Sequence, residues 1–327
     1  MVVKKNILIT GGLGYIGTHV VNLLLKSNYK VTVVDKIMFG SSSLLSFLGS
    51  DNFEFFNFDI REDEKLNNLF KNKNFSAVIH LAALVGEAAC KRNEDESKLI
   101  NYDATISLAK KSKMFGVQNF IFMSTASSYG VQDINEIADE KTKLNPVSLY
   151  AITKINSEKE LLDKFSEDLN ITIFRPSTVH GVSPRMRFDL IVNHLTLDAF
   201  NDGNISVFGP KMWRPLMWVG EPARIFKIVL EADQKLIKSQ IFNLGSDNEN
   251  FQKIHIAECL KNNFFPKLNI RVTDKDPDLR SYRVSFQKIK ETLKYETSKT
   301  LKEAISEILV LLKNNNEIDT KSAIFRN

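Results

Sequence analysis

The first half of the chain alternates short apolar runs with segments in which apolar residues recur at helical spacing. This helical periodicity covers residues 15–27, 95–116 and 150–169. The apolar runs have the length of strands and lie near residues 6–10, 30–35, 52–59, 77–83, 117–124 and 171–175. Strands that alternate with helices of this length predict an α/β fold with a doubly wound parallel sheet.

The pattern changes after Pro176, where prolines and glycines become frequent and the apolar runs become shorter. Short strands and helices are predicted there over 205–208, 241–244, 253–262 and 301–313. We therefore expect one larger domain over 1–176, with return segments near 217–250. A smaller mixed α/β lid is expected over 177–327.

A glycine-rich turn joins the first predicted strand to the first predicted helix, in the sequence Thr10-Gly11-Gly12-Leu13-Gly14-Tyr15-Ile16-Gly17. Gly11 allows a sharp turn off the strand, Gly14 leaves room for a pyrophosphate, and Gly17 allows the helix to pack close to the strand. Phosphates bind at such a helix start because N–H groups and the positive end of the helix dipole point at them. The turn therefore predicts a dinucleotide site.

An acidic residue ends the second predicted strand, at the spacing from the glycine turn that is typical of dinucleotide sites. A carboxylate at Asp35 would accept hydrogen bonds from the adenosine ribose and repel a 2′-phosphate, which favours NAD over NADP. The alternative is a glycine-rich turn that happens to lie beside an exposed acid. This alternative explains each feature by itself, but it does not explain why strand, turn, helix, strand and acid follow one another in this order.

Composition excludes several other classes of protein. The chain has 327 residues, 43% hydrophobic and 25% charged, and its net charge of +5 comes from scattered basic residues, so no nucleic-acid partner is expected. The cysteines, Cys90 and Cys259, lie far apart without metal-ligand spacing. No apolar run approaches the length of a membrane span. The first strand begins within a few residues of the start, so we expect a cytoplasmic protein.

Side chains suited to proton transfer follow the strand predicted over 117–124. Ser124 and Thr125 lie at the carboxyl edge, where doubly wound sheets bind ligands. Tyr150 and Lys154 share one face of a predicted helix, and the ammonium would favour the phenolate of a tyrosine, whose ordinary pKa is about 10. Tyr150 would take a proton from a sugar hydroxyl while hydride passes to NAD, and Thr125 would hold that oxygen. A solvated helix face is the alternative for this spacing alone.

Taken together, these motifs resemble those of the extended short-chain dehydrogenase/reductases of the nucleotide-sugar epimerase and dehydratase family. The matching stretches are Thr10–Gly17, Asp35, Asp59-Ile60, Leu81-Ala82-Ala83, Asn101, Ser124–Gly130, Tyr150–Lys154 and Arg175-Pro176. The resemblance implies a Rossmann domain over 1–176 that binds NAD, and a lid that binds a nucleotide-diphosphate sugar. It also implies that Tyr150 is the catalytic acid/base, with Lys154 and Thr125 as its partners.

We expect NAD to be bound at the carboxyl edge of the sheet, with the adenine near Asp59-Ile60 and the small side chains at 81–83 lying against the flat cofactor. The full set of expected cofactor residues is Gly11, Gly14, Tyr15, Ile16, Gly17, Asp35, Lys36, Asp59, Ile60, Leu81, Ala82, Ala83, Asn101, Ser124, Tyr150 and Lys154.

Two positions after Thr125 depart from the dehydratases of the family, which carry an acidic pair there. This chain has Ala126 and Ser127. Loss of water from a sugar needs an acid and a base beyond Tyr150, so the sequence favours oxidation at C4 alone. That is the chemistry of a 4-epimerase or of a 4-dehydrogenase that stops at the ketone. A 4,6-dehydratase or 4-ketoreductase of the same family, and a catalytically idle NAD sensor, are the alternatives.

Further similarities concern the substrate and the assembly. Residues 84–93 and 183–190 are similar to the GDP-D-glycero-D-manno-heptose 4-dehydrogenase branch, which adds a GDP-heptose-like sugar to the candidate substrates. The residues expected to contact the nucleotide sugar are Ser127, Thr178, Arg185, Arg187, Arg214 and Arg280. An arginine fork suits phosphate oxygens, and an ion pair within the protein is the alternative for each arginine. The resemblance also implies a homodimer in which helices around 97–115 and 150–167 form a four-helix bundle.

Overall fold

A computed structural model describes residues 5–133, 135–276, 278–315 and 318–327, which group into two compact units. The first unit consists of the chain up to Thr125, Ser148–Arg175 and Pro222–Phe242, and the second consists of Ala126–Val147, Pro176–Glu221 and the chain from Asn243 onward. The boundary expected at residue 176 assigns 126–147 to the larger domain, whereas this segment groups with the second unit.

The first unit contains a seven-stranded sheet in the order β11-β7-β5-β4-β1-β2-β3. Its strands are β1 (Asn6–Thr10), β2 (Lys30–Asp35), β3 (Phe53–Asn57), β4 (Ala77–His80), β5 (Asn119–Met123), β7 (Asn170–Pro176) and β11 (Gln240–Leu244). Every pairing from β3 across to β7 is parallel. The order runs outward from β1 in both directions, which confirms the predicted doubly wound topology.

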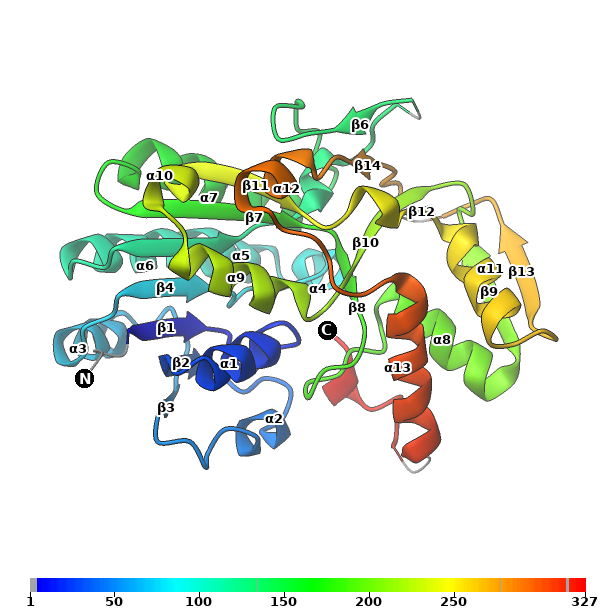
Figure 1. Ribbon diagram of the computed structural model, residues 1–327, viewed down its shortest axis with the longest axis horizontal. Helices are drawn as coiled ribbons and strands as arrows, with labels where there is room; N and C mark the ends of the chain where they lie inside the picture. The colour runs from blue at the N-terminus through cyan, green and yellow to red at the C-terminus, as the bar shows by residue number, and fades with distance from the viewer. Residues whose placement is uncertain (1–4, 134, 277, 316–317) are drawn as a thin grey trace. The chain divides into compact units, whose positions relative to one another are not determined.

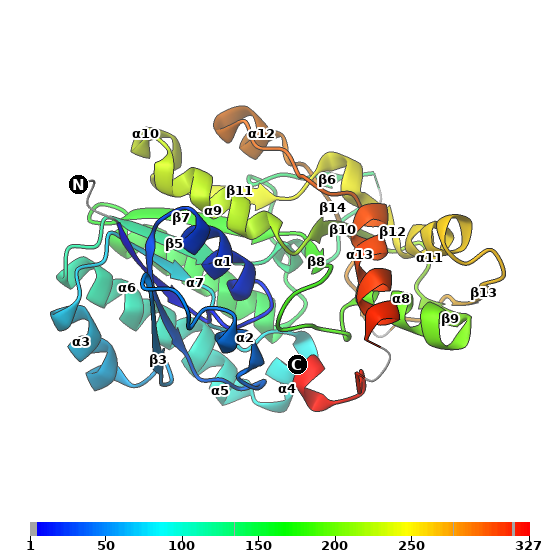
Figure 2. The same cartoon turned by 60° about the horizontal axis from the view of Figure 1, so that its bottom comes forward.

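Helices cover both faces of this sheet (Figures 1 and 2). On one face lie α1 (Gly17–Lys26) and α9 (Glu221–Glu231). On the other lie α3 (Asp63–Asn72), α6 (Ala104–Met114) and α7 (Leu149–Phe165). The short helices of the unit are α2 (Ser42–Leu45), α4 (Glu87–Arg92), α5 (Glu94–Lys98) and α10 (Gln234–Ile237).

The core of the first unit lies between the sheet and the α3, α6 and α7 layer. Leu8, Val78 and Phe120 come from three neighbouring strands, and they belong to one buried cluster with Leu108 of α6 and Leu161 of α7. All five side chains are fully buried. Burying an aliphatic or aromatic side chain of this size stabilises the fold by about 1.5–3 kcal/mol.

The single helix predicted over 95–116 is interrupted. The structure has α5, then a π-helical turn over Leu99–Asp103, then α6. The carbonyl of Asn101 in this turn accepts hydrogen bonds from the hydroxyls of Thr105 and Ser157, both at 2.9 Å. Side-chain donors that enter the helical hydrogen-bond ladder locally widen the turn.

The second unit is a mixed α/β structure, as expected, with three small sheets. Their strands are β8 (Thr178–His180), β10 (Trp213–Trp218) and β12 (Asn250–Gln252), then β9 (Asn204–Phe208) with β13 (Asn269–Thr273), and β6 (Ile137–Ala138) with β14 (Arg283–Val284). The helices are α8 (Ile191–Asp202), α11 (Lys253–Asn263), α12 (Gln287–Leu293) and α13 (Leu301–Asn314), with 3-10 turns at 126–129, 247–249 and 323–325.

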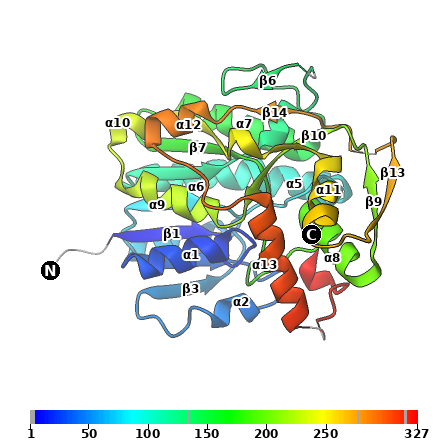
Figure 3. The ribbon, with the colours of Figure 1, turned by 45° about the vertical axis from the view of Figure 1, so that its right-hand side comes forward.

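Helix α13 packs against both α8 and α11, and the β9–β13 pair lies against α8 and α11 (Figure 3). The helix begins at a capping box in which Thr300 and Glu303 satisfy each other's backbone N–H groups. Leu301, Ile305 and Ile308 are buried at helical spacing, so the amphipathic pattern of this segment correctly predicted the helix.

Candidate functional site

The turn between β1 and α1 has the close approaches that its glycines were expected to allow. Gly11 has a φ of +73°, and a Cβ on it would lie 2.6 Å from the backbone nitrogen of Ala82. A Cβ on Gly17 would lie 2.3 Å from the carbonyl oxygen of Gly11. A Cβ on Gly14 would meet the same oxygen at 3.2 Å, a much milder contact. The fold itself therefore needs glycine at 11 and 17, whereas a ligand is the better reason for glycine at 14.

The acid at the end of β2 lies against this turn. Asp35 is half-buried, and its Oδ2 accepts a hydrogen bond from the Leu13 N–H at 3.0 Å. Its Oδ1 accepts one from the Ile37 N–H at 2.9 Å. Tyr15 and Ile16 come directly after the turn, where the chain enters α1. The residues expected to hold the phosphates and the adenosine ribose therefore lie together.

Lys36 and Asp59, both expected to contact the cofactor, are paired with each other. The ammonium of Lys36 lies 3.0 Å from Oδ2 of Asp59, and the guanidinium of Arg61 grips both oxygens of the same carboxylate at 2.9 and 2.7 Å. The hydrogen bonds from Arg61 hold the pKa of Asp59 well below its usual range. Ile60, the next residue, is buried, so its side chain belongs to the core.

The segment after β4 is held by the backbone of β1 and by the side chain of Asn101. The Leu81 N–H donates to the Thr10 carbonyl at 3.0 Å, next to the glycine turn, and Ala82 and Ala83 are half-buried behind it. The carboxamide of Asn101 is buried, accepts from the Leu84 N–H at 2.8 Å and donates to the Leu84 carbonyl at 2.9 Å. Asn101, expected among the cofactor residues, therefore bonds with its side chain to the loop after β4.

Helix α7 brings the lysine to the end of β5, and the tyrosine precedes it by one turn on the same helix. The hydroxyl of Ser148 caps the helix by accepting from the Ala151 N–H, so that Tyr150 stands in the first turn. Lys154 is 2% exposed, and its ammonium donates to the Met123 carbonyl at 2.9 Å. Burial lowers the pKa of Lys154 to about 7, against the attraction of Cys90 and Glu158, which raise it.

Thr125 is 7% exposed and follows Ser124 at the same strand end. Ser124 donates its hydroxyl proton to the carboxylate of Glu158. That carboxylate also forms a buried ion pair with Arg175 of β7, at 3.1 Å from Nε and 2.6 Å from Nη2. The pair ties α7 to two strand ends, and removal of one partner from a buried pair typically costs about 3–5 kcal/mol.

Sequence reasoning missed Glu158, although its position gave a signal. It stands one helical turn after Lys154, on the face already defined by Tyr150 and Lys154. His80 is fully buried between the hydroxyls of Thr10 at 2.6 Å and Thr105 at 2.9 Å. Burial lowers the pKa of His80 to about 3, so its ring is neutral.

Three of the residues expected to bind the nucleotide sugar come together in the second unit. Arg280 donates from Nη1 to the hydroxyl of Ser127 at 2.7 Å. Its Nε and Nη2 grip the two oxygens of Asp278 at 2.8 and 2.7 Å. Arg214 is 3% exposed, and its Nη2 lies 2.8 Å from the same carboxylate.

The other three expected residues of the second unit have different partners. Arg185 donates to the Arg326 carbonyl at 3.1 Å and to Oδ1 of Asn327 at 2.6 Å. Arg187 forms a two-point ion pair with Asp189, at 3.0 and 2.5 Å. Thr178 lies in β8, where it pairs with a residue of β10. Sequence spacing alone could not separate these arginines from the pair that meets at Asp278.

The described residues contain neither a membrane-spanning helix nor a cluster of metal ligands. No helix among them combines the length and the apolar character needed to cross a membrane. In the same part of the chain, no three His, Cys, Asp or Glu side chains gather so that they could hold a metal ion.

Comparison with known proteins places these features in a wider group. The model of the "NAD dependent epimerase/dehydratase family" matches residues 7–245. A relative described as a putative UDP-glucose 4-epimerase, from Methanocaldococcus jannaschii, is 27% identical over 95% of this chain and 99% of its own length.

Solved structures give the same grouping. The UDP-glucose 4-epimerase of Thermotoga maritima, determined with UDP-glucose, is 26% identical, covers 95% of this chain and 100% of its own, and has a TM-score of 0.84. The UDP-glucuronic acid 4-epimerase of Bacillus cereus, determined with UDP-glucuronic acid and NAD, covers 94% of this chain and 99% of its own. It has a TM-score of 0.84 at 23% identity, so it shows the shared fold.

Proposed function

Because the chain belongs to the NAD-dependent epimerase/dehydratase family, we propose that it oxidises C4 of a nucleotide-activated sugar and acts as a 4-epimerase. The observation that carries this proposal is the α7 face of Tyr150 and Lys154, anchored to the end of β5 beside Thr125. A 4-dehydrogenase that stops at the ketone is the second candidate, because it needs the same groups.

The residues of the β1–α1 turn fit NAD. The protein's own packing does not demand glycine at position 14, so the missing side chain there is best explained by a phosphate group that lies against the backbone. When bound, NAD supplies the acceptor for a hydride from the sugar. The protein's own part is proton transfer. The ammonium of Lys154 favours the phenolate of Tyr150, the phenolate oxygen accepts the proton of the C4 hydroxyl, and the Thr125 hydroxyl holds the sugar oxygen.

The positions after Thr125 support C4 chemistry over loss of water. Ala126 and Ser127 are buried and carry no acidic group, and the Ser127 hydroxyl accepts a hydrogen bond from Arg280. A 4,6-dehydratase needs a further acid and base to remove a proton and a hydroxyl group, so it is the weaker alternative here.

We assign NAD to the first unit and the nucleotide diphosphate to Ser127, Arg214 and Arg280 of the second. A fork of N–H groups is the arrangement that binds phosphate oxygens in pairs. The relatives named above act on UDP-sugars, which makes UDP-glucose and UDP-glucuronic acid the first substrates to test. A GDP-heptose is the next. The described cysteines are free thiols, which supports the expected cytoplasmic location.

The first experiment identifies the bound cofactor and the product. We expect mass spectrometry of the denatured protein to find NAD. Incubation with the nucleotide sugars should yield the C4 epimer by NMR, without net change at the absorbance band of reduced nicotinamide. A ketone together with reduced nicotinamide would instead identify a 4-dehydrogenase.

Substitution of the tyrosine tests the catalytic assignment. Tyr150→Phe should lower kcat by about 10²–10⁴, because the general acid/base is lost, while the NAD content stays that of the wild type. The comparison is Tyr29→Phe, which removes a phenol that donates to Glu231 just before the start of β2 and should leave kcat unchanged. If no sugar is converted and Tyr150→Phe binds sugars as the wild type does, the protein is an NAD sensor.

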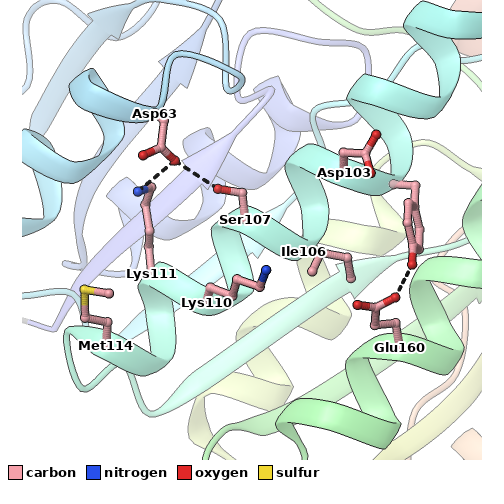
Figure 4. A pocket seen from close by; sticks show the side chains of 9 residues that line it. Asp63, Asp103, Ile106, Ser107, Lys110, Lys111, Met114 and Glu160 are labelled. Carbon is pink, nitrogen blue, oxygen red and sulfur yellow. Dashed lines mark hydrogen bonds and ion pairs between the residues drawn. The ribbon is translucent and has the colours of Figure 1, made fainter.

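We also propose that the protein forms a homodimer through the α6 and α7 layer. This layer exposes apolar side chains, with Met114 71% and Ile152 41% exposed. A hollow of about 610 Å³ lies on it (Figure 4), lined by Asp63, Tyr102, Asp103, Ile106, Ser107, Lys110, Lys111, Met114 and Glu160. Exposed apolar groups beside a hollow are what a second helix pair would cover.

A further inference from the structure

Two arginines assigned to the diphosphate already hold one carboxylate of their own unit. Asp278 receives Arg280 through both of its oxygens, at 2.8 and 2.7 Å, and its Oδ2 also lies 2.8 Å from Nη2 of Arg214. The remaining hydrogen bond of the Arg280 fork, from Nη1, goes to Ser127. The carboxylate thus accepts hydrogen bonds from the pair of guanidinium N–H groups that would otherwise donate to a phosphate group.

Arg214 is fixed independently of the carboxylate. Its Nη1 donates to the Trp213 carbonyl at 2.8 Å and to the Arg280 carbonyl, and its side chain is 4% exposed. The cation therefore stays in place whether or not Asp278 is bound to it. Arg280 and Asp278 are more accessible, with side chains 20% and 29% exposed, so an anion from solution can reach them.

The charge of Asp278 is not removed by pH in the working range of an enzyme. Burial would raise the pKa of Asp278, but hydrogen bonds from Arg280 and the charge of both arginines outweigh it and hold the pKa well below its usual range. The carboxylate therefore stays negative, and an incoming anion has to compete with it for the two arginines.

We propose that Asp278 is an internal competitor for the diphosphate of the nucleotide sugar, which must displace its carboxylate from Arg214 and Arg280. This inference rests on the proposed function, since it takes these arginines as the diphosphate site. Asp278 then sets the affinity of the site. A ligand with the paired oxygens of a diphosphate replaces the carboxylate contacts, whereas an anion that makes a single contact does not.

The test is a titration calorimetry series with pyrophosphate and UDP as probes. Asp278→Asn keeps the shape and one acceptor oxygen but removes the charge, and we expect its Kd for both probes to fall at least tenfold. The matched control is Asp274→Asn, which removes one negative charge from an exposed position of the same segment, four residues before Asp278. Its Kd should change less than threefold.

Asp278→Glu keeps the charge and should leave the Kd within threefold of the wild type, and thermal melting verifies that all three variants are folded. The proposal is overturned if Asp278→Asn binds the probes as weakly as the wild type or more weakly, because the carboxylate would then only position the arginines. Equal gains in both Asn variants would also overturn it, since they would reflect net charge alone.

These results are separate from the test of the proposed function. A protein that converts no sugar, but whose Asp278→Asn variant gains affinity for pyrophosphate, would refute the epimerase and support the competitor. A protein that epimerises a sugar, but whose Asp278→Asn variant gains no affinity for pyrophosphate, would support the epimerase and refute the competitor.

Discussion

At the scale of single residues, we propose that Asp35 serves both the fold and the cofactor. Its carboxylate holds the glycine turn through the Leu13 N–H and its own strand end through the Ile37 N–H. It also stands where a ribose diol of NAD would be bound. Each carboxylate oxygen can accept more than one hydrogen bond, so a contact with the backbone and a contact with a ribose are chemically compatible.

Asp35→Ser should therefore change the choice of cofactor. The hydroxyl still accepts a backbone hydrogen bond, but the charge that repels a 2′-phosphate is gone. We expect the Kd for NAD to rise about tenfold and the Kd for NADP to fall about tenfold, both measured by fluorescence titration, where tenfold is about 1.4 kcal/mol. Asp51→Ser, at an exposed acid of the same unit, should alter neither value. An unchanged preference would mean that Asp35 serves the turn alone.

Contacts within a local motif were easier to predict than contacts between distant segments. The glycine turn and its acid form a local pattern, so Gly11 and Asp35 were placed correctly relative to each other. The pair of Glu158 and Arg175 joins a helix to a strand, and the grip of Asp278 on Arg214 joins segments far apart in the chain. Such pairings depend on the tertiary fold, which residue spacing does not encode.

At the scale of elements, periodicity predicted most of the first unit, whereas after residue 176 it predicted only β9, β11, α11 and α13, all of which are present. All strands expected in the first half are present. Helix α3 was missed, although Leu66, Leu69 and Phe70 recur there at helical spacing. Strand β10 was missed because Pro215 argues against a strand that pairs on both sides. The strands of the second unit are short and pair with distant segments, so local patterning carries little information about them.

The start of α13 provides a pH-dependent prediction. Oε2 of Glu249 accepts the Leu301 N–H at 3.1 Å in a buried setting, and burial raises the pKa of Glu249 from 4.5 to about 7. The folded state then binds more protons than the unfolded state between these values. The contribution of Glu249 to the free energy of unfolding should therefore fall as the pH rises from about 4.5 to 7.

Glu249→Gln keeps the acceptor for Leu301 without a charge. Urea unfolding at several pH values should show that this variant lacks the decline contributed by Glu249. Glu258→Gln, at an exposed position of α11, should keep the wild-type slope. An identical slope in all three proteins would show that Glu249 is ionised in the folded state without cost.

At the scale of the whole molecule, the α6 and α7 layer is expected to join two copies. A charge at the exposed Met114 would be desolvated in such an interface, so Met114→Glu should shift the protein from twice the mass of one chain to one chain mass. The measurement is size-exclusion chromatography with light scattering at micromolar concentration.

The matched variant for this experiment is Val310→Glu, which places the same charge at an apolar position of α13 that is 55% exposed. It should leave the mass unchanged. A wild-type protein that is monomeric at these concentrations, or a Met114→Glu protein that stays dimeric, would contradict the assignment of the interface.

Each unit is assembled from three separate stretches of the chain. No single cut can therefore excise either one, and a fragment that stops near residue 176 would lack α9 and β11. Phe174 would lose Phe226 and Phe242, the rings that it packs against at 5.7 and 5.9 Å. A single contiguous block exchanged between such proteins would consequently divide this cluster of rings, whereas an exchange of the whole second unit has to include all three of its stretches.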